Sequence, residues 1–309
     1  MKTETFHLEL ITPCFCGGAE QARAEIRPSA IRGQFRWWFR ALGGTGAEER
    51  ALFGGVHGDV RAGSLIVRVC DLQVGQPWTP FPMKMGSPGA YIWYFASVSA
   101  DKKRWWTQPP GPRGNPPGKT NPDGHLPPGT AFTLELRWRN SPPQQLQDKL
   151  TRAREAFLRF GAIGMRATRG MGGFVCREFQ SYASETKERA KELFAGSGFV
   201  VRWRDRTWRK WEDVVFDAER WLKDDMRHEY NANKRPSSPL GGSSPRQTSA
   251  VYFRPVKFSG DTFGLMIFEA SHEKVLGATA RTRQPVIESR TFAGEPPAPV
   301  RGGRIGGRR

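Results

Sequence analysis

The fold is decided by residues 144–176, QQLQDKLTRAREAFLRF-GAIGMRATRGMGG-FVC, in which a helix, a glycine-rich turn and a strand are predicted in succession. The helix is predicted because apolar residues recur along one side of it, at Leu146, Leu150, Ala153, Phe157 and Phe160. The turn is predicted over residues 161–173, which contain five glycines. The apolar triplet Phe174–Cys176 then predicts a short strand.

The residues before this stretch supply the rest of a first domain. Alternation of apolar and polar residues predicts strands at Thr5–Leu10 and Phe132–Trp138, and β-branched and aromatic residues predict strands at Gly63–Val69 and Tyr91–Val98. Pro28 opens a helix that ends near Leu42, before Gly43 and Gly44. Residues 107–129 hold eight prolines and five glycines and are predicted to be a long loop. The order β-α-β-(β)-β-α-β, with one additional strand, is the ferredoxin-like arrangement and occupies residues 1–180.

The chain after residue 180 repeats parts of this pattern. Helices are predicted at Glu185–Phe194 and Glu212–Glu229, a Pro/Ser/Gly loop at 231–249, and strands near Val251–Val256 and Phe263–Phe268. We therefore predict an α+β protein with two ferredoxin-like (RRM-like, βαββαβ) domains, 1–180 and 181–309. The second domain is expected to be reduced or degenerate.

The charge balance indicates the class of partner. The 309 residues include 48 Lys and Arg against 30 Asp and Glu, a net charge of +18, which favours a nucleic acid as partner. The sequence has no run of 18 apolar residues, and residues 1–11 alternate, so neither a membrane span nor secretion is expected. The four cysteines lack zinc-site spacing and are expected to be reduced thiols of a cytoplasmic protein. No metal or cofactor is predicted.

The predicted helix that starts at Pro28 carries the strongest anion-binding pattern. Arg32, Arg36 and Arg40 fall at i, i+4 and i+8, and three stacked like charges repel one another unless an anion lies across them. Ser29 adds a hydroxyl beside the free N–H groups of the helix start, which suit a phosphate. The alternative is a solvated face whose arginines are neutralised by acidic residues from elsewhere in the chain.

Three further segments predict contact with RNA. Arg166 and Arg169 lie inside the glycine-rich turn, whose main chain could approach a phosphate closely. Residues 202–211, RWRDRTWRKW, interleave cations with three tryptophans. They are either a stacking platform beside a phosphate track or a basic edge strand that packs its tryptophans inward. The C-terminal residues 301–309 resemble an RGG tail and would add salt-sensitive affinity.

Several of these motifs resemble the RAMP superfamily of CRISPR-associated proteins. Ile163-Gly164 followed by Gly170-x-Gly172 is similar to its glycine-rich loop, and Ser29-x-x-Arg32-Gly33-x-x-Arg36 to its basic helix start. The longer run Arg36-Trp37-Trp38-Phe39-Arg40, with Leu52-Phe53-Gly54 after it, resembles the first subunit of the Cmr (type III-B) effector complex.

The resemblance implies two ferredoxin-like domains and a place near the end of a ribonucleoprotein that contains other RAMP subunits. It implies a non-catalytic, RNA-binding role in antiviral defence, with contacts to the 3′ part of a CRISPR guide RNA and to its target RNA. Together with the basic segments, it nominates as RNA-binding residues Ser29, Arg32, Gly33, Arg36, Trp37, Arg40, Gly164, Arg166, Arg169, Gly170, Gly172, Arg202 and Arg204.

Two alternatives stay open. The five histidines are scattered without an H-D pair, and adjacent carboxylates such as Asp224 and Asp225 point in different directions on a helix. A metal-independent endoribonuclease that processes CRISPR RNA needs only a general base, for which His7 or His57 could serve. The other alternative is a structural subunit whose basic surface docks an acidic neighbour.

Overall fold

The computed structural model describes residues 3–18, 24–55, 61–78, 125–227, 239–243, 246–272, 274 and 286–295. The predicted strand at 91–98, most of the predicted loop at 107–129, His57 and the C-terminal tail lie outside the described residues.

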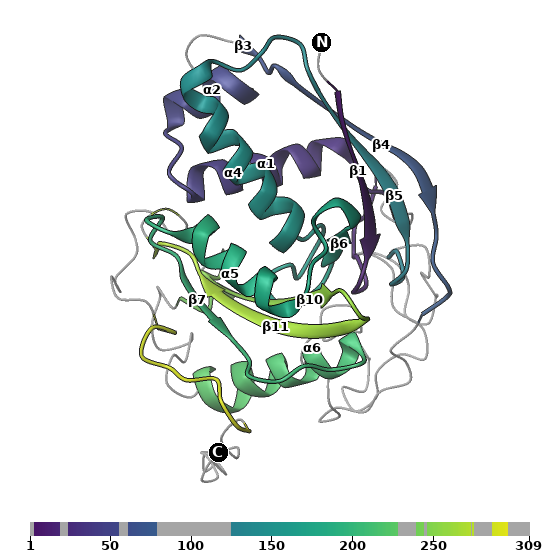
Figure 1. Ribbon diagram of the computed structural model, residues 1–309, viewed down its shortest axis with the longest axis vertical. Helices are drawn as coiled ribbons and strands as arrows, with labels where there is room; N and C mark the ends of the chain where they lie inside the picture. The colour runs from purple at the N-terminus through teal and green to yellow at the C-terminus, as the bar shows by residue number, and fades with distance from the viewer. Residues whose placement is uncertain are drawn as a thin grey trace, which may run out of the picture.

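The first half of the chain is a four-stranded antiparallel sheet covered by helices. Its strands are β1 (Thr3–Leu10), β4 (Leu65–Gln73), β5 (Ala131–Trp138) and β6 (Phe174–Cys176), in the order β4-β5-β1-β6. Its main helices are α1 (Pro28–Ala41) and α4 (Gln144–Phe160), which lie side by side against one face of the sheet (Figure 1). The succession β1-α1-β4-β5-α4-β6 is βαββαβ, so the ferredoxin-like prediction is confirmed for this half.

A short helical excursion separates α1 from β4. It consists of α2 (Gly46–Phe53), β2 (Gly54–Gly55) and β3 (Arg61–Ala62). The start of α2 is a capping box, because the Thr45 hydroxyl accepts from the Glu48 N–H while the Glu48 carboxylate accepts from the Thr45 N–H. This reciprocal cap satisfies main-chain N–H groups at the start of α2 and stabilises that end of the helix.

Hydrophobic periodicity explains why these elements pack together. On β1, Phe6, Leu8 and Leu10 point inward at period two. On α1 the inward side chains are Ile31, Phe35, Trp38 and Phe39, and the Phe35 ring centroid lies 4.7 Å from that of Phe157 on α4. The opposite face of α1 is left free of core packing.

The second half forms a three-stranded antiparallel sheet with helices on both faces. Its strands are β7 (Val200–Trp203), β10 (Val251–Phe258) and β11 (Thr262–Glu269), in the order β10-β11-β7. Helix α5 (Ala183–Phe194) lies on the side of the first half, and α6 (Trp211–Arg220) lies on the other (Figure 1). The short elements are η2 (Arg177–Phe179), β8 (Gly242–Ser243) and β9 (Arg246–Gln247). The succession β7-α6-β10-β11 repeats the first βαββ of the fold with the same strand order, which agrees with a second, reduced copy.

The predicted helix at Glu212–Glu229 differs in its second part. Helix α6 ends at Arg220, and residues Trp221–Met226 continue as a π-helical segment, η3. This wider turn places Trp221, Leu222 and Met226 all in the interior. The strand predicted at Gly63–Val69 starts instead at Leu65 and runs to Gln73, where it forms the sheet edge.

The two halves share one hydrophobic core. Alternate residues of β10 point in opposite directions: Tyr252 and Val256 pack with the first half, while Val251 and Phe253 pack with α6. Both faces of this sheet are therefore covered, and the second half is anchored along its length to the first. The boundary at residues 180 and 181 stays a prediction.

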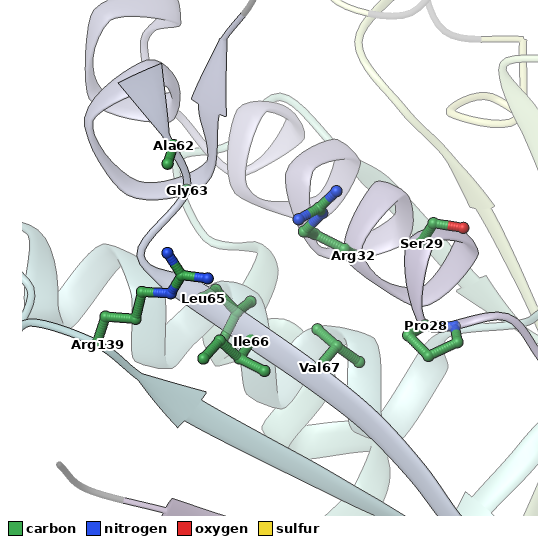
Figure 2. A pocket seen from close by; sticks show the side chains of 9 residues that line it. All are labelled: Pro28, Ser29, Arg32, Ala62, Gly63, Leu65, Ile66, Val67 and Arg139. Atoms are coloured by element: carbon green, nitrogen blue, oxygen red, sulfur yellow. The ribbon is translucent and has the colours of Figure 1, made fainter.

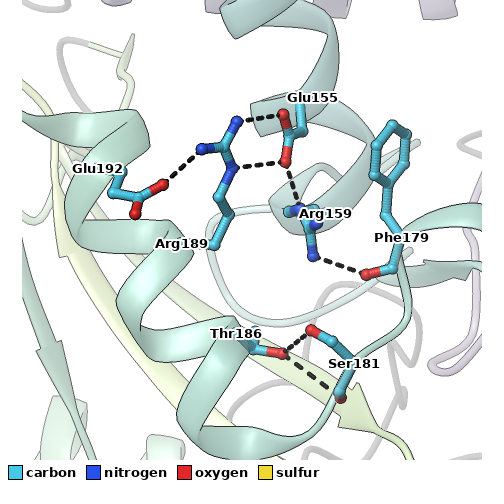
Figure 3. Close-up of polar contacts among 7 residues, drawn as sticks. All are labelled: Glu155, Arg159, Phe179, Ser181, Thr186, Arg189 and Glu192. Carbon is cyan, nitrogen blue, oxygen red and sulfur yellow. Dashed lines mark hydrogen bonds and ion pairs between the residues drawn. The ribbon is translucent and has the colours of Figure 1, made fainter.

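A buried carboxylate ties α4 to α5 between the halves. Glu155 on α4 accepts from Arg189 on α5 at 2.7 and 2.8 Å and from Arg159 at 2.7 Å, as Figure 3 shows. Burial raises the pKa of Glu155, but hydrogen bonds from the two guanidinium groups outweigh it and leave that pKa below its ordinary value. Glu155 is therefore held ionised, and the pairing fixes the angle between the helices.

Candidate nucleic-acid interface

The exposed face of α1 gathers most of the predicted helix residues. Ser29, Arg32, Gly33 and Arg40 are exposed, and Arg36 is half-buried beside them. Trp37 lies at the edge of this face, half-buried against Tyr252 at 5.4 Å between ring centroids. The 3.6-residue period thus places the predicted residues of this segment on one continuous surface.

The start of α1 has no negative group to offset the positive end of its helix dipole. Pro28 occupies the first turn, the cap residue Arg27 makes no side-chain cap hydrogen bond, and the first turn contains no acidic residue. The positive end of the helix dipole, equivalent to about half a charge, is therefore not compensated within the helix. A phosphate is the type of group that such an end attracts.

An open pocket of about 440 Å³ lies at this helix start. Ser29 and Arg32 line it from α1 and Arg139 lines it from the end of β5, so that the two guanidinium groups flank the opening (Figure 2). The remaining wall is Pro28 with residues 62, 63 and 65–67. Neither arginine side chain makes a hydrogen bond or ion pair with any described residue, so both keep their donors for a ligand. No pattern in the sequence predicts that Arg139 belongs to this site. Arg139 is 107 residues from Arg32, and only the folded structure brings the two side chains to one pocket.

The other two arginines of the α1 face have an acidic partner. Glu49 of α2, whose side chain is only 7% exposed, lies 2.6 Å from Arg36 Nε and 3.2 Å from Arg40 Nε. One carboxylate thus relieves the repulsion within the arginine row, and that repulsion does not by itself require RNA. Arg36 and Arg40 still have side chains that are 39% and 55% exposed, so they can add long-range attraction.

Gly33 lies in the middle of the α1 face, where no neighbour in the described part of the chain requires a glycine. A Cβ built at this position would meet no atom within 4 Å. A glycine in an exposed helix interior lowers stability by about 1 kcal/mol relative to alanine. A close approach by a ligand is the physical reason that would favour glycine here.

Replacing Gly33 by alanine is therefore expected to have opposite effects on stability and on binding. The free energy of unfolding should rise by about 0.8–1 kcal/mol in urea denaturation, because the helix gains propensity. RNA affinity should fall by about tenfold, equivalent to about 1.4 kcal/mol, because the methyl group stands between the helix and the phosphate backbone. Fluorescence anisotropy with labelled RNA measures the second effect.

Gly46→Ala is the matched control for Gly33→Ala. Gly46 is also helical, at the start of α2, with no atom within 4 Å of a built Cβ. It should leave RNA affinity unchanged. Equal affinity of the two variants would remove Gly33 from the interface.

The glycine-rich turn is closed by internal hydrogen bonds. Ile163 N–H donates to Gly172 O at 2.9 Å, and Gly172 N–H donates to Pro13 O at 2.9 Å. Gly172 has φ +64°, and a Cβ there would lie 1.7 Å from Ile163 O, so glycine is required by packing within the protein. Gly170 is buried beside the Pro255 ring, while Gly164 and the half-buried Arg166 lie at the exposed end of the turn. The expectation of a free main chain that approaches a phosphate is corrected for Gly170 and Gly172.

Two of the predicted RNA-binding arginines are structural. Arg169 is buried and donates to Leu240 O at 2.6 Å and to Ser249 Oγ and Val251 O at 3.3 Å, which ties the glycine-rich turn to the second half. The side chain of Arg204 is fully buried and paired with Asp217 at 2.7 Å. Because their donors are used inside the protein, we remove both residues from the candidate interface. Arg202 donates to the main-chain oxygens of Val201 and Glu288 and is half-buried.

The Arg/Trp segment 202–211 packs its tryptophans inward, as the second interpretation expected, but it is an edge strand only as far as Trp203, and Trp211 already begins α6. β7 is an edge strand, Trp208 and Trp211 are buried, and Trp203 packs against the core. These tryptophans face the interior, where they are not available to stack on bases.

The candidate catalytic histidine is held by a carboxylate. His7 Nδ1 lies 2.6 Å from Glu178 Oε1, and the His7 side chain is 51% exposed.

Within the described part of the chain, no group of three His, Cys, Asp or Glu residues is arranged to hold a metal ion. The described helices include none long and apolar enough to cross a membrane.

Fold and site together define a class. The complete ferredoxin-like half and the glycine-rich turn between α4 and β6 agree with the RAMP superfamily that the sequence motifs resemble. The sequence model of the RAMP superfamily matches residues 7–175, more than half of the chain, and the chain belongs to this superfamily.

A short stretch of this chain is similar to one curated relative within the superfamily. The chain is 49% identical over 39 residues to the CRISPR system Cmr subunit Cmr1-2 of Pyrococcus furiosus. That match covers 13% of this chain and 21% of the relative, so it spans about a fifth of the relative's length.

Two solved structures share the fold over most of the chain. The crystal structure of apo Cmr1 from Pyrococcus furiosus matches with a TM-score of 0.53 at 18% identity, over 94% of this chain and 92% of that one. A chain of the type III-B Cmr-beta complex bound to cognate target RNA matches with a TM-score of 0.52 at 11% identity. This second match covers 86% of this chain and 94% of that chain. The architecture is thus a Cmr1-like RAMP fold.

Proposed function

We propose that this protein is a non-catalytic, RNA-binding subunit of a type III-B (Cmr) CRISPR effector complex in the cytoplasm. Its RNA ligands would be the 3′ part of the guide RNA and the target RNA, and its protein partners would be other RAMP subunits. The observation that carries the proposal is the pocket at the start of α1, where Arg32 and Arg139, which pair with no described residue, meet the uncompensated positive end of a helix. Such a site binds phosphate regardless of base identity.

The comparisons support this assignment from a different direction. The short match at 49% identity is to a Cmr subunit, and one structural neighbour is part of a Cmr-beta complex that holds target RNA. The net charge of +18 provides the long-range attraction that such a complex requires.

A salt titration of RNA binding tests the proposal. The logarithm of the association constant should fall linearly with the logarithm of the salt concentration, by about 0.7 for each neutralised phosphate of a single strand. Affinity should change little between RNAs of scrambled sequence. Equal affinity for an RNA analogue with an uncharged backbone would contradict the proposal.

The two alternatives give different results in simple experiments. The carboxylate of Glu178 holds His7 through Nδ1, and Nε2 makes no hydrogen bond to a described residue, which is the arrangement that a general base needs. A discrete cut in repeat RNA in the presence of chelator, abolished in His7→Ala, would establish an endoribonuclease instead. Association with an acidic subunit that survives exhaustive nuclease treatment would establish a docking protein.

A further inference from the structure

A buried carboxylate contacts two arginines of the exposed α1 face at the same time. Glu49 Oε1 lies 2.6 Å from Arg36 Nε, and Glu49 Oε2 lies 3.2 Å from Arg40 Nε. The Glu49 side chain is buried, whereas both arginine side chains reach the solvent. The carboxylate therefore lies on the inner side of the two guanidinium groups, and their outer side is left to the surroundings of the protein.

Both arginines use their Nε atoms to contact the carboxylate. A guanidinium group can also bind an anion through the edge formed by its two Nη atoms. The Nη atoms of Arg36 and Arg40 make no hydrogen bond to a residue that the structure describes. Residues at i and i+4 of a helix have Cβ atoms about 5–6 Å apart, so the two Nη edges belong to one small patch of the α1 face.

Helix α2 keeps Glu49 in place independently of the arginines. At the start of α2, the Glu48 carboxylate accepts from Lys149 Nζ of α4 at 2.7 Å, in addition to its capping hydrogen bond. At the end of α2, the buried Phe53 ring packs edge-on against Phe39 of α1, with 5.9 Å between centroids. Glu49 is thus carried by a helix that is attached to both α1 and α4.

This arrangement has two effects of opposite sign on the binding of an anion. The negative charge of Glu49 lowers the attraction that the α1 face exerts over long distances. The same charge gathers Arg36 and Arg40, which would otherwise repel each other and sample many rotamers. A side chain that is already ordered loses less entropy when a ligand binds to it, so the second effect strengthens binding.

We propose that Glu49 is a positioning residue of the RNA interface, which orients the Nη edges of Arg36 and Arg40 toward a phosphate of the RNA backbone. The paired donors of such an edge match two phosphate oxygens. Each guanidinium group then lies between two anions, with Glu49 on the inner side and the phosphate on the outer side. This inference rests on the proposed RNA-binding function and gives a buried acidic residue a favourable part in it.

Glu49→Gln tests the inference, because glutamine keeps the shape of the side chain but has one accepting oxygen and no charge. We expect RNA affinity to fall about tenfold, equivalent to about 1.4 kcal/mol, since both arginines must then be ordered when RNA binds. The variant gains one unit of positive charge, so long-range attraction alone predicts a higher affinity. Fluorescence anisotropy with labelled RNA at fixed salt concentration measures the sign of the change.

Glu25→Gln is the charge-matched control. Glu25 is exposed, three residues before the start of α1, and its replacement changes the net charge by the same amount. RNA affinity should stay equal to that of the wild-type protein or rise by up to about twofold. An equal fall in Glu25→Gln and Glu49→Gln would contradict a specific role of Glu49.

A double-mutant cycle separates positioning from a general structural role. In the background of Arg36→Ala/Arg40→Ala, Glu49→Gln should cause no further loss of RNA affinity, because its effect passes through these two arginines. A tenfold loss in that background as well would show that Glu49 acts through the packing of α2, and would overturn the inference.

The failure of this inference is distinguishable from the failure of the proposed function. Unchanged or higher affinity in Glu49→Gln, with weakened binding in Arg32→Ala/Arg139→Ala, would overturn the inference alone. Absence of RNA binding by the wild-type protein would overturn both. If Glu49→Gln does not fold, Arg36→Lys/Arg40→Lys keeps the charge but removes the separate Nε and Nη edges. Wild-type affinity in that variant would equally overturn the inference.

Discussion

Replacing both Arg32 and Arg139 by alanine is expected to weaken RNA binding by about 100-fold. Each guanidinium group lines the pocket and pairs with none of the residues that the structure describes, so each is available for a charge-assisted hydrogen bond to phosphate. Such bonds contribute about 1.5 kcal/mol each or more, and about 3 kcal/mol corresponds to roughly two decades in the dissociation constant. The salt slope should fall by about 1.4 for two lost phosphate contacts.

The structure provides a charge-matched control for this double variant. Arg177 follows β6 at the opposite edge of the first sheet from β4, and Lys223 lies in η3 beneath the second sheet. Both are exposed. Arg177→Ala/Lys223→Ala removes the same two charges away from the pocket, and should weaken binding by severalfold at most. If the two double variants bind RNA equally, the attraction is a property of net charge and the pocket is not an RNA site.

Replacing Arg204 by alanine is expected to produce the largest loss of stability among the arginine variants. Arg204 donates to both oxygens of Asp217, at 2.7 and 3.3 Å, and to the main-chain oxygens of Phe292 and Gly294. Its loss leaves the buried Asp217 charged and unpaired, which costs about 3–5 kcal/mol in the free energy of unfolding. Urea denaturation measures this loss directly.

The loss of stability in Arg204→Ala is expected to depend on pH through the protonation of Asp217. Burial raises the pKa of Asp217 above its ordinary value even though Arg204 opposes the shift. Without Arg204 the pKa should rise further, and protonation then removes the unpaired charge in the folded state. The stability deficit should therefore be smaller in mildly acidic buffer than at neutral pH.

Arg206→Ala is the control for Arg204→Ala. Arg206 lies two residues further along, and its ion pair with Glu295 at 2.7 Å is exposed on both sides. An exposed pair of this kind contributes about 0–1 kcal/mol. Similar losses in the two variants would show that Arg204 is not the interior anchor that its burial indicates.

Much of the fold could be predicted because its elements are encoded locally. The boundaries of α4 and β6 and the start of α1 follow from short-range signals: the 3.6-residue period, a proline in the first turn and glycines after the last. The π-helical segment after Arg220 could not be predicted, because the apolar period of a helix does not distinguish a normal turn from a widened one.

The candidate site was only partly predictable. The exposed face of α1 follows from helical period alone, and Ser29, Arg32 and Gly33 lie on it as expected. Arg139 and Glu49 escaped prediction since each reaches the α1 face from another element. Arg169 and Arg204 were misassigned because a cationic residue near glycines or tryptophans looks the same in sequence whether it faces solvent or the interior.

The sequence by itself determined that this protein is an α+β chain with a ferredoxin-like first half, a basic helix face and an excess of 18 positive charges. These properties depend on residue type and on spacing within a single element. Only the tertiary structure decided which cations remain available to a ligand. It paired Arg36 and Arg40 with Glu49, enclosed Arg169 and Arg204, and left Arg32 and Arg139 open at one pocket. The physical reason is that the state of a charge is set by burial and by acceptors within about 3 Å, and those acceptors come from segments far away in the sequence.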